Sequence, residues 1–453
     1  MLIKKSTLIV LAGAIALIGG VYWFQARSEK AEKPSSDTSK PAFSIQADDI
    51  TGLTISHPDK KDQSPIQLSE RNGSWNILQP VTTGADEAAV RGIVDGLASA
   101  RISESEPGTP DRLKAYGLDS PRAELDFELK NGTKHRILLG DRDFTEVYVY
   151  SVIDGAKSVS LLPISLYNSA DKAVDDLRDR SVLHIDSGKV SSFELKNASG
   201  ELTASKQTVK DQTEWNFTKP LGVRADDDGV NSLLSAVASG KFTKIAEEKP
   251  EKLGPYGLTR AAVTFTAVDD AGQKHTLLVG NKQGDGYLAR DESRPTIFVI
   301  NEDLYKKLTE NFGQLRDKAL VHITEGDVNR VELKDSSGTT AMTRKPGSDF
   351  DWTIESPADV KGKSAATWKI FSPLTSARAE EVIDHTTGAI VQKLEKPAIE
   401  VNLTEKSGSK FTIKISGADG DFVFGQTSAG PTVYKLKKSI LDDLNLKPSD
   451  LGS

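Results

Sequence analysis

The chain of 453 residues contains no cysteine and only two methionines. Without thiols it can form no disulfide and no cysteine-ligated zinc site, and it offers neither a thiol nucleophile nor the cysteine of a lipoprotein anchor. An excess of basic charge is also missing, since the formal net charge is −7. Nucleic-acid binding needs a concentrated basic face, so we expect no nucleic-acid partner. What is present, 37% hydrophobic and 27% charged residues, is ordinary globular material for about three domains.

A stretch near the N-terminus has the composition of a membrane span. Lys4 and Lys5 precede Ser6–Phe24, 19 residues that carry no charge and are mostly apolar. At about 1.5 Å per residue such a helix nearly crosses the bilayer core, and Tyr22–Phe24 close it as an interfacial aromatic belt would. No clear small-x-small site follows Phe24, so we interpret residues 1–24 as an uncleaved anchor, with a cleaved signal peptide as the alternative.

Residues 25–42 contain almost nothing that can pack, which predicts a flexible tether. The basic residues on the two sides of the anchor nearly balance. We place the N-terminus inside because a large polar part follows the first hydrophobic segment directly. The expected location is therefore the cytoplasmic (inner) membrane, with a single-pass anchor and the bulk of the chain extracytoplasmic, or periplasmic.

One segment recurs three times and predicts an architecture of repeats. Trp75-Asn-Ile-Leu-Gln-Pro80 returns as Trp215-Asn-Phe-Thr-Lys-Pro220 and as Trp352-Thr-Ile-Glu-Ser-Pro357, at offsets of 140 and 137 residues. Each tryptophan alternates at period two with an isoleucine or phenylalanine, so both side chains lie on one face of a strand. We interpret the three tryptophans as core residues rather than as platforms for stacking sugars.

An amphipathic helix follows each tryptophan strand, because apolar residues recur at i, i+3, i+4 and i+7. The three stripes are Val90, Ile93, Val94 and Leu97; Val230, Leu233, Leu234 and Val237; and Thr367, Ile370, Phe371 and Leu374. Pro373 must kink or shorten the third helix. Asp86 and Asp226 are predicted N-caps.

Two further charged groups are interpreted through these helices. Asp226–Asp228 are read as a cap with favourable charges beside it, because a calcium loop alternates its carboxylates and needs a distal glutamate. Arg101, Lys241 and Arg378 follow the three helices, where cations complement a helix C-terminus. An anion-binding row of these three cations is the alternative.

The remaining elements also repeat. Leu113-Lys-Ala-Tyr-Gly-Leu118 matches Leu253-Gly-Pro-Tyr-Gly-Leu258, and Gly117 and Gly257 suit the left-handed residue that ends a helical turn. Alternating strands then predict hairpins at 123–139, 262–279 and 399–415. The segments 177–184 and 315–322 echo each other and connect one copy to the next.

We therefore predict an α+β fold of three tandem repeats, each an antiparallel sheet with helices, after a single N-terminal transmembrane helix. The expected modules are 43–183, 184–321 and a divergent third module at 322–453. Their connectors are short and apolar, so the modules are expected to pack in a fixed row.

No catalytic, cofactor-binding or metal-binding residue is predicted. His135 pairs with His275 and His184 with His322 across the repeat, which favours packing roles, with a pH-responsive junction as the alternative. No His-x-x-x-His spacing indicates a metal. Gly280–Gly286 lies between two strands and is interpreted as a hairpin turn rather than a phosphate loop. No nucleophile–base pair can be named.

The Trp-x-[Ile/Phe]-x-x-Pro strand, the Ala-Asp helix start and the Tyr-Gly-Leu segment resemble the bacterial family called domain of unknown function 4340. The third copy lacks Tyr-Gly-Leu and keeps only Leu394-Glu-Lys-Pro397. The resemblance implies an anchored extracytoplasmic protein, often encoded beside an ABC transporter of the gliding-motility auxiliary type. We expect a non-catalytic accessory or scaffold protein with an ABC transporter permease as possible partner. The alternatives are a module that binds envelope glycan or lipid, and a hydrolase.

Overall fold

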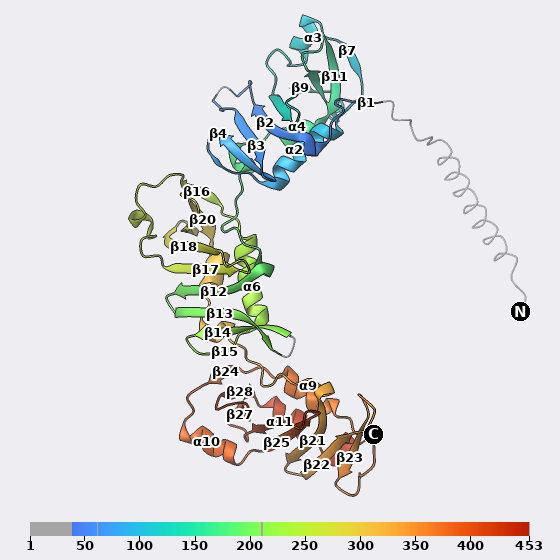
Figure 1. Cartoon of the computed structure of the whole chain (residues 1–453), viewed down its shortest axis with the longest axis vertical. Helices are drawn as coiled ribbons and strands as arrows, with labels where there is room; N and C mark the ends of the chain where they lie inside the picture. Colours follow the sequence, from blue (N-terminus) through green and yellow to red (C-terminus); the bar gives the residue numbers. More distant parts are fainter. Residues whose placement is uncertain (1–38, 61, 210–211, 453) are drawn as a thin grey trace, which may run out of the picture. The chain divides into compact units, whose positions relative to one another are not determined.

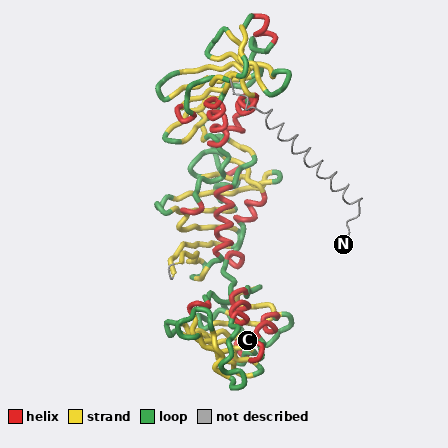
Figure 2. Tube along the Cα trace, turned by 90° about the vertical axis from the view of Figure 1, so that its right-hand side faces the viewer, coloured by secondary structure: helices red, strands yellow, loops and turns green. Residues whose placement is uncertain are grey.

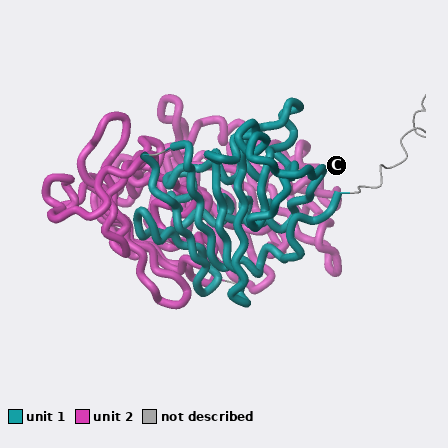
Figure 3. Tube along the Cα trace, turned by 90° about the horizontal axis from the view of Figure 1, so that it is seen from above, with its two compact units in different colours: residues 1–180 teal, residues 181–453 magenta. Residues whose placement is uncertain are grey.

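The computed structural model describes residues 39–60, 62–209 and 212–452. The anchor expected at residues 6–24 and most of the expected tether lie outside these ranges. Among the described residues no helix is both long and apolar enough to cross a membrane. The described chain divides into two compact units, which adjoin in sequence at Arg180 and Ser181 (Figure 3).

The first unit is a single α+β module. Its strands are β1 (Lys40–Pro41), β2 (Ile50–Ser56), β3 (Ile66–Arg71), β4 (Ser74–Gln79), β5 (Thr83–Gly84), β6 (Arg101–Ile102), β7 (Ser105–Pro107), β8 (Ala123–Leu129), β9 (Lys134–Arg142), β10 (Tyr148–Ile153) and β11 (Ser158–Pro163). Its helices are α2 (Glu87–Ser99), α3 (Pro110–Ala115), α4 (Ile164–Ala170) and α5 (Val174–Leu177), with a 3-10 turn η1 (Ala47–Asp49). Nine strands form one antiparallel sheet in the order β5-β4-β3-β2-β8-β9-β10-β11-β7, and β1 pairs with β6 (Figure 1).

The second unit contains two further sheets. Elements of the first are β12 (Val190–Asn197), β13 (Gly200–Val209), β14 (Gln212–Lys219), β15 (Val223–Arg224), α6 (Asp227–Ser239), β16 (Lys244–Glu247), η3 (Gly254–Tyr256), β17 (Val263–Asp269), β18 (Lys274–Gln283), β19 (Gly286–Asp291), β20 (Ile297–Asn301), α7 (Glu302–Leu308) and α8 (Phe312–Leu315), after η2 (Ser187–Lys189). Elements of the second are β21 (Val328–Asp335), β22 (Gly338–Arg344), β23 (Trp352–Ser356), α9 (Trp368–Ser376), β24 (Glu381–Ile383), α10 (Gly388–Glu395), β25 (Ile399–Glu405), β26 (Lys410–Ile415), β27 (Phe422–Thr427), β28 (Val433–Lys437), α11 (Ser439–Leu444) and α12 (Pro448–Leu451), after η4 (Glu325–Asp327).

The three sheets share one strand order. The second runs β15-β14-β13-β12-β17-β18-β19-β20-β16, and the third runs β23-β22-β21-β25-β26-β27-β28-β24. In the third, an isolated bridge between Thr353 and Ser364 stands where β5 and β15 pair in the others. The predicted α+β class with mostly antiparallel sheet is therefore confirmed, and the structure repeats as the sequence does.

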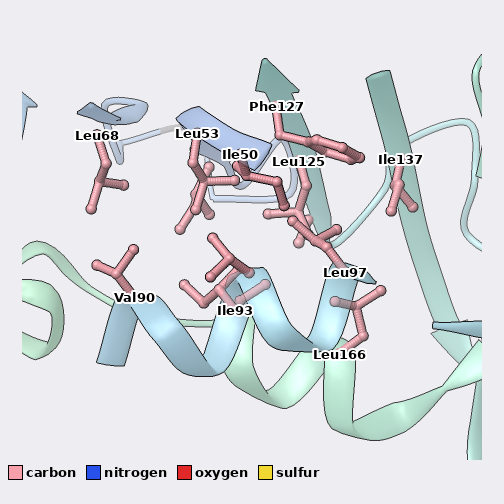
Figure 4. Packing of buried hydrophobic residues seen from close by; sticks show 14 of the residues in the cluster. Ile50, Leu53, Leu68, Val90, Ile93, Leu97, Leu125, Phe127, Ile137 and Leu166 are labelled. Carbon is pink, nitrogen blue, oxygen red and sulfur yellow. The ribbon is translucent and has the colours of Figure 1, made fainter. Parts of the chain in front are cut away.

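The main helix of each module covers one face of its sheet. In the first unit Asp86 caps α2 by accepting hydrogen bonds from the backbone N–H groups of Ala88 and Ala89, both at 3.0 Å. The predicted stripe of α2 is buried and meets Leu53 of β2 and Phe127 of β8, which are paired in register (Figure 4). In the second module the helices also pack against one face of the sheet and run across its strands (Figure 2).

The predicted core tryptophans are confirmed. Trp75, Trp215 and Trp352 are 8%, 2% and 2% exposed, and the peptide bond before the proline of each repeated segment is cis. Helix α9 is shorter than α2 and α6, with 9 residues against 13 in each, and Pro373 lies inside it.

A smaller core covers the other face of each sheet near its β10, β19 or β27 strand. In the first unit Gly117 has a positive φ of 65°, and the N–H of Leu118 donates to the carbonyl of Leu113 at 2.7 Å, as predicted for the end of a helical turn. A Cβ at Gly140 would lie 2.2 Å from the carbonyl oxygen of Tyr116, so the strand needs glycine there. Gly280 meets Tyr256 in the same way.

Packing places the module starts a little earlier than expected. Val182 and Leu183 belong to the second core, and Leu320 and Val321 belong to the third. The boundary expected at 184 thus lies at Ser181. Residues 39–42, expected in the tether, belong to the first module because β1 pairs with β6 and the N–H of Ala42 donates to the carbonyl of Ala100 at 2.8 Å.

Replacing Trp215 by alanine is expected to destabilise the second unit by about 3–5 kcal/mol, because it empties a buried aromatic site. Trp368→Ala is the matched control, since Trp368 is 63% exposed and should change stability by less than about 0.5 kcal/mol. Urea unfolding of both variants measures the difference. Equal midpoints for Trp215→Ala and wild type would contradict the core assignment.

Candidate functional site at the junction of the second and third modules

A charged cleft of about 490 Å³ lies inside the second unit, where α6 begins and the connector enters the third module. It gathers several residues that the sequence singled out. Its lining consists of Arg224, Ala225, Asp226, Asp227, Asp228, Asp317, Lys318, His322 and Arg378. Four carboxylates thus face three cationic side chains and one histidine.

The aspartates at the start of α6 serve the fold, as predicted. Asp226 caps the helix through the N–H of Asp228 at 3.2 Å. Asp227 accepts a hydrogen bond from the N–H of Trp215 at 2.7 Å and another from Arg224 at 2.9 Å. Among the described residues no group of three or more histidines, aspartates or glutamates is arranged to hold a metal ion.

His322 and Asp317 form a pair at the edge of the cleft. The Nε2 atom of His322 lies 2.5 Å from Oδ2 of Asp317, whose Oδ1 accepts the N–H of Ala319 at 3.0 Å. Burial alone would raise the pKa of Asp317, but the hydrogen bonds from His322 and Ala319 outweigh it and the pKa is lowered. Such a pair can hold and transfer a proton. None of the nine described lining residues carries a hydroxyl or thiol for it to activate.

Behind the cleft, one bidentate ion pair joins the two modules. Arg316, at the end of α8, donates to both carboxylate oxygens of Asp384 at 2.5 and 2.7 Å, and its side chain is 7% exposed. Thr432 donates to the same carboxylate at 3.3 Å. The hydrogen bonds from Arg316 hold the pKa of Asp384 below its usual range. Arg316 was not singled out from the sequence, because its partner lies 68 residues away.

Two backbone bridges hold the connector, one at Arg316 itself and one three residues later. Arg316 bridges to Ala225 at the start of α6, and Ala319 bridges to Arg378 after α9. Only Asp317 and Lys318 lie between the two bridges. Each neighbouring module therefore holds the connector through its own backbone.

The other predicted residues take structural places. Lys241 donates to the Ser181 hydroxyl at 3.0 Å, and Arg378 donates to the carbonyls of Thr375 and Ala377. Arg101 donates to Ser39 in the same manner. The contacts of Arg378 are those expected of a cation at a helix end. Arg101 and Lys241 bind a serine at the start of the module instead.

The repeat-related histidines lie at strand ends or connectors. His135 lies 2.8 Å from Asp154, and His275 lies 3.4 Å from Asp269. His184, shortly after the start of the second module, lies 4.0 Å from Asp291. The Gly280–Gly286 segment belongs to the β18–β19 hairpin, as predicted. Gly280–Gln283 end strand β18, and the turn lies between Gln283 and Gly286.

Comparison with known families supplies the identity of the fold. The family described as "Domain of unknown function (DUF4340)" matches residues 75–214 and 215–389. The chain belongs to this family. Each match begins at a repeated tryptophan, so the DUF4340 unit starts at β4 or β14 and runs into the next module. The match ends inside α10, in the third copy that lacks Tyr-Gly-Leu. No curated protein matches the chain.

One titratable cluster of this DUF4340 chain escaped sequence reasoning. His57, buried at the end of β2, lies 3.3 Å from Asp171, which also accepts hydrogen bonds from Lys60 at 2.8 Å and from Tyr167 at 3.2 Å. In the second unit Asn197 stands at the corresponding place and donates to two carbonyls after α7, at 3.1 Å each. Both residues tie the first strand to the end of a helix, which indicates a structural role.

His57→Asn is expected to remove part of the acid sensitivity of the first unit. Burial, and then the neighbouring Lys60, lower the pKa of His57 below 6.5, against the opposing charges of Asp59 and Asp171. The neutral form therefore stabilises the fold fully above about pH 6.5, and this contribution is lost as pH falls through the lowered pKa. Thermal unfolding at pH 7.5 and pH 5 measures the slope. An equal fall in both proteins would contradict the assignment.

Asp384→Asn is expected to destabilise the joint by about 3 kcal/mol at pH 7, because it leaves a buried guanidinium without its charge partner. The lowered pKa of Asp384 means that the ion pair is complete above about pH 3.8 and is lost as pH falls through the lower folded value. Glu355→Gln is the control, since its pair with Arg330 is largely exposed and is worth less than about 1 kcal/mol. The two variants should differ in urea midpoint at pH 7, and the difference should shrink as pH falls through the lowered pKa of Asp384. Equal effects at pH 7 would contradict this assignment.

Proposed function

We propose that this DUF4340 protein is a non-catalytic, membrane-anchored scaffold that acts outside the cytoplasm beside an ABC transporter. The observation that supports it best is the construction of the joint between the second and third modules. Arg316 is paired with Asp384, His322 with Asp317, and Arg224 with Glu214 and Asp227. Charges that are already paired within the fold have little to offer a ligand, whereas a fixed joint suits a protein that presents a surface.

The membrane location and the transporter partner in this proposal are inferred from the sequence. Residues 6–24 have the composition of an anchor in the cytoplasmic membrane. A relaxed chain of the length of residues 25–38 would span about 20 Å, which would keep the first module close to the bilayer. The resemblance to proteins encoded beside ABC transporters supports a permease as the partner.

A second candidate function is binding of envelope glycan. The repeated tryptophans are buried and cannot stack on a sugar, but Trp368 at the start of α9 is 63% exposed. Its flat face suits a pyranose ring. Quenching or blue shift of tryptophan fluorescence by envelope glycan, abolished by Trp368→Ala, would favour this candidate.

Affinity purification of the full-length protein from membranes is expected to recover an ABC-type permease. Loosening the joint by Arg316→Ala with Asp384→Ala should lower the recovery, because the two modules no longer present one surface. Replacing His135 and His275 together by glutamine is the control and should leave the recovery unchanged, since both histidines pair locally within single modules.

Two outcomes would overturn the scaffold proposal. One is recovery of soluble enzymes only. The other is a hydrolytic activity of the purified protein that is lost on replacing a single polar residue such as His322.

A further inference from the structure

The first unit has a pocket that the proposed function does not use. It has a volume of about 160 Å³ and lies on the sheet face that carries the smaller core. Its apolar floor is Tyr150 of β10 with Val159 and Leu161 of β11. Its rim is formed by Glu104 and Glu106, at edge strand β7, and by Phe144 in the β9–β10 turn.

A turn with several internal hydrogen bonds holds the side chain of Phe144 exposed to solvent. Its ring is 96% exposed, and Val147 beside it is also exposed. The buried carboxylate of Asp143 accepts hydrogen bonds from the N–H and hydroxyl of Thr145, at 3.1 and 2.5 Å, and from the N–H of Tyr148 at 2.9 Å. An apolar ring presented by such a turn beside a pocket indicates an interaction site, since single scattered apolar residues need no such support.

The same strip of strand is more deeply buried in the second module. Ile297 and Val299 stand where Val159 and Leu161 stand in the first unit. The small cores of both modules hold the repeated leucine and tyrosine, Leu113 and Tyr116 or Leu253 and Tyr256, but Val299 is buried whereas Leu161 is only half-buried. The β18–β19 hairpin turns tightly at Gln283 and Gly286 and carries no aromatic residue there. The half-exposed Leu161 and the aromatic turn beside it therefore distinguish the first module from the second.

The pocket has a negative excess. Glu106 pairs with Arg112 at 3.1 Å. The backbone carbonyl of Glu104 accepts the N–H of Leu161 at 2.9 Å, but its carboxylate has no hydrogen bond or ion pair with any described residue. Burial and then the carboxylates of Asp143, Glu106 and Glu104 raise the pKa of the Tyr150 phenol. A guanidinium or ammonium group is the complement of aromatic faces flanked by free carboxylate.

The corresponding edge of the third module already takes an arginine. Strand β24 occupies the place of β7 at the end of its sheet, and Asp384 directly after it binds Arg316. In the first unit Pro107 stands at the place of Asp384, so an incoming arginine would meet Glu104 and the aromatic floor instead.

We propose that this pocket docks an arginine or lysine side chain from an extended segment of a partner protein. The cation lies against Tyr150 and Glu104, and Phe144 and Val147 cover its aliphatic stem. The segment runs along β7. This strand is the last in the nine-stranded sheet of the unit, so its outer edge can pair with an added strand. This inference deepens the proposed function and rests on it for the partner's identity. Insertion of Phe144 into a membrane is disfavoured, because Glu104 and Glu146 would be repelled by anionic lipid.

Site-specific photo-crosslinking in native membranes tests the proposal. Full-length protein carrying p-benzoylphenylalanine in place of Phe144 is irradiated, and the crosslinked peptide is identified by mass spectrometry. We expect a protein segment with arginine or lysine within a few residues of the crosslink. Glu104→Gln with Glu106→Gln should lower the yield about tenfold, as for the loss of one charge-assisted contact. The same probe at Phe350, an exposed loop aromatic of the third module, is the control and should not capture this segment.

The outcomes separate this proposal from the function on which it rests. A basic segment of an ABC permease supports both. A basic segment of another protein supports the docking site and contradicts the transporter partner. Crosslinks to lipid only, to a segment without basic residues, or with a yield independent of Glu104 and Glu106 overturn the docking site. Since Phe144 is almost fully exposed, an unchanged melting temperature verifies that each probe protein is folded.

Discussion

Two residues that lead into the main helix hold each module together, because three segments of the chain meet there. The N–H groups of Ala85, Ala225 and Ala365 donate to the carbonyls of the three repeated tryptophans. The next N–H in each module donates to the carbonyl of the last leucine of that module, Leu177, Leu315 or Leu451. Buried backbone N–H groups need partners, and here the two that lead into the helix bind the tryptophan strand and the module's end. The buried tryptophan, the Ala-Asp start and the terminal leucine are thus parts of one arrangement.

The joint between modules follows from this arrangement. Because the last turn is fixed against the start of the main helix, the chain leaves each module at a defined point, one residue after that leucine. In the second unit Arg316 is the residue at this point, and its side chain binds Asp384 of the third module. Three residues later, Ala319 forms a backbone bridge with Arg378. The cleft is the space left between these fixed segments, and the Asp317–His322 pair fills its edge. A residue such as His322 can therefore recur with the repeat for structural reasons alone.

Local patterns predicted most of the fold and little of the surface. The fold was predicted from short-range sequence patterns. The periodicity of apolar residues indicates which face of a strand or helix is buried, and the Tyr-Gly-Leu segments indicate turns. Contacts between distant residues carry no such signal. Arg316 and Asp384 look like ordinary surface residues, and His57 was hidden because Asn197 performs the same role with another side chain. The second module was predicted to start at residue 184 because Val182 and Leu183 resemble the end of a connector. In the structure their apolar side chains pack into the core of the second module. Phe144 and Trp368 lie outside the repeated pattern, so their exposure could be read only from the structure.

The third module shows which parts of the design are free to vary. It keeps the main core and the bonds at the helix start, but it lacks Tyr-Gly-Leu. Ser416 follows strand β26, where Gly140 and Gly280 meet a tyrosine carbonyl in the other two modules. Helix α10 packs on β27 instead and covers the small core there with Leu394. Once the tyrosine carbonyl is absent, glycine is no longer needed, so the two changes belong together. The face covered by the main helix is therefore shared, whereas the opposite face varies. The first module has the Phe144 turn beside a pocket, the second has a tight β18–β19 turn, and the third is covered by α10. We therefore expect each module to bind partners through the sheet face opposite the main helix, because the shared fold does not constrain that face.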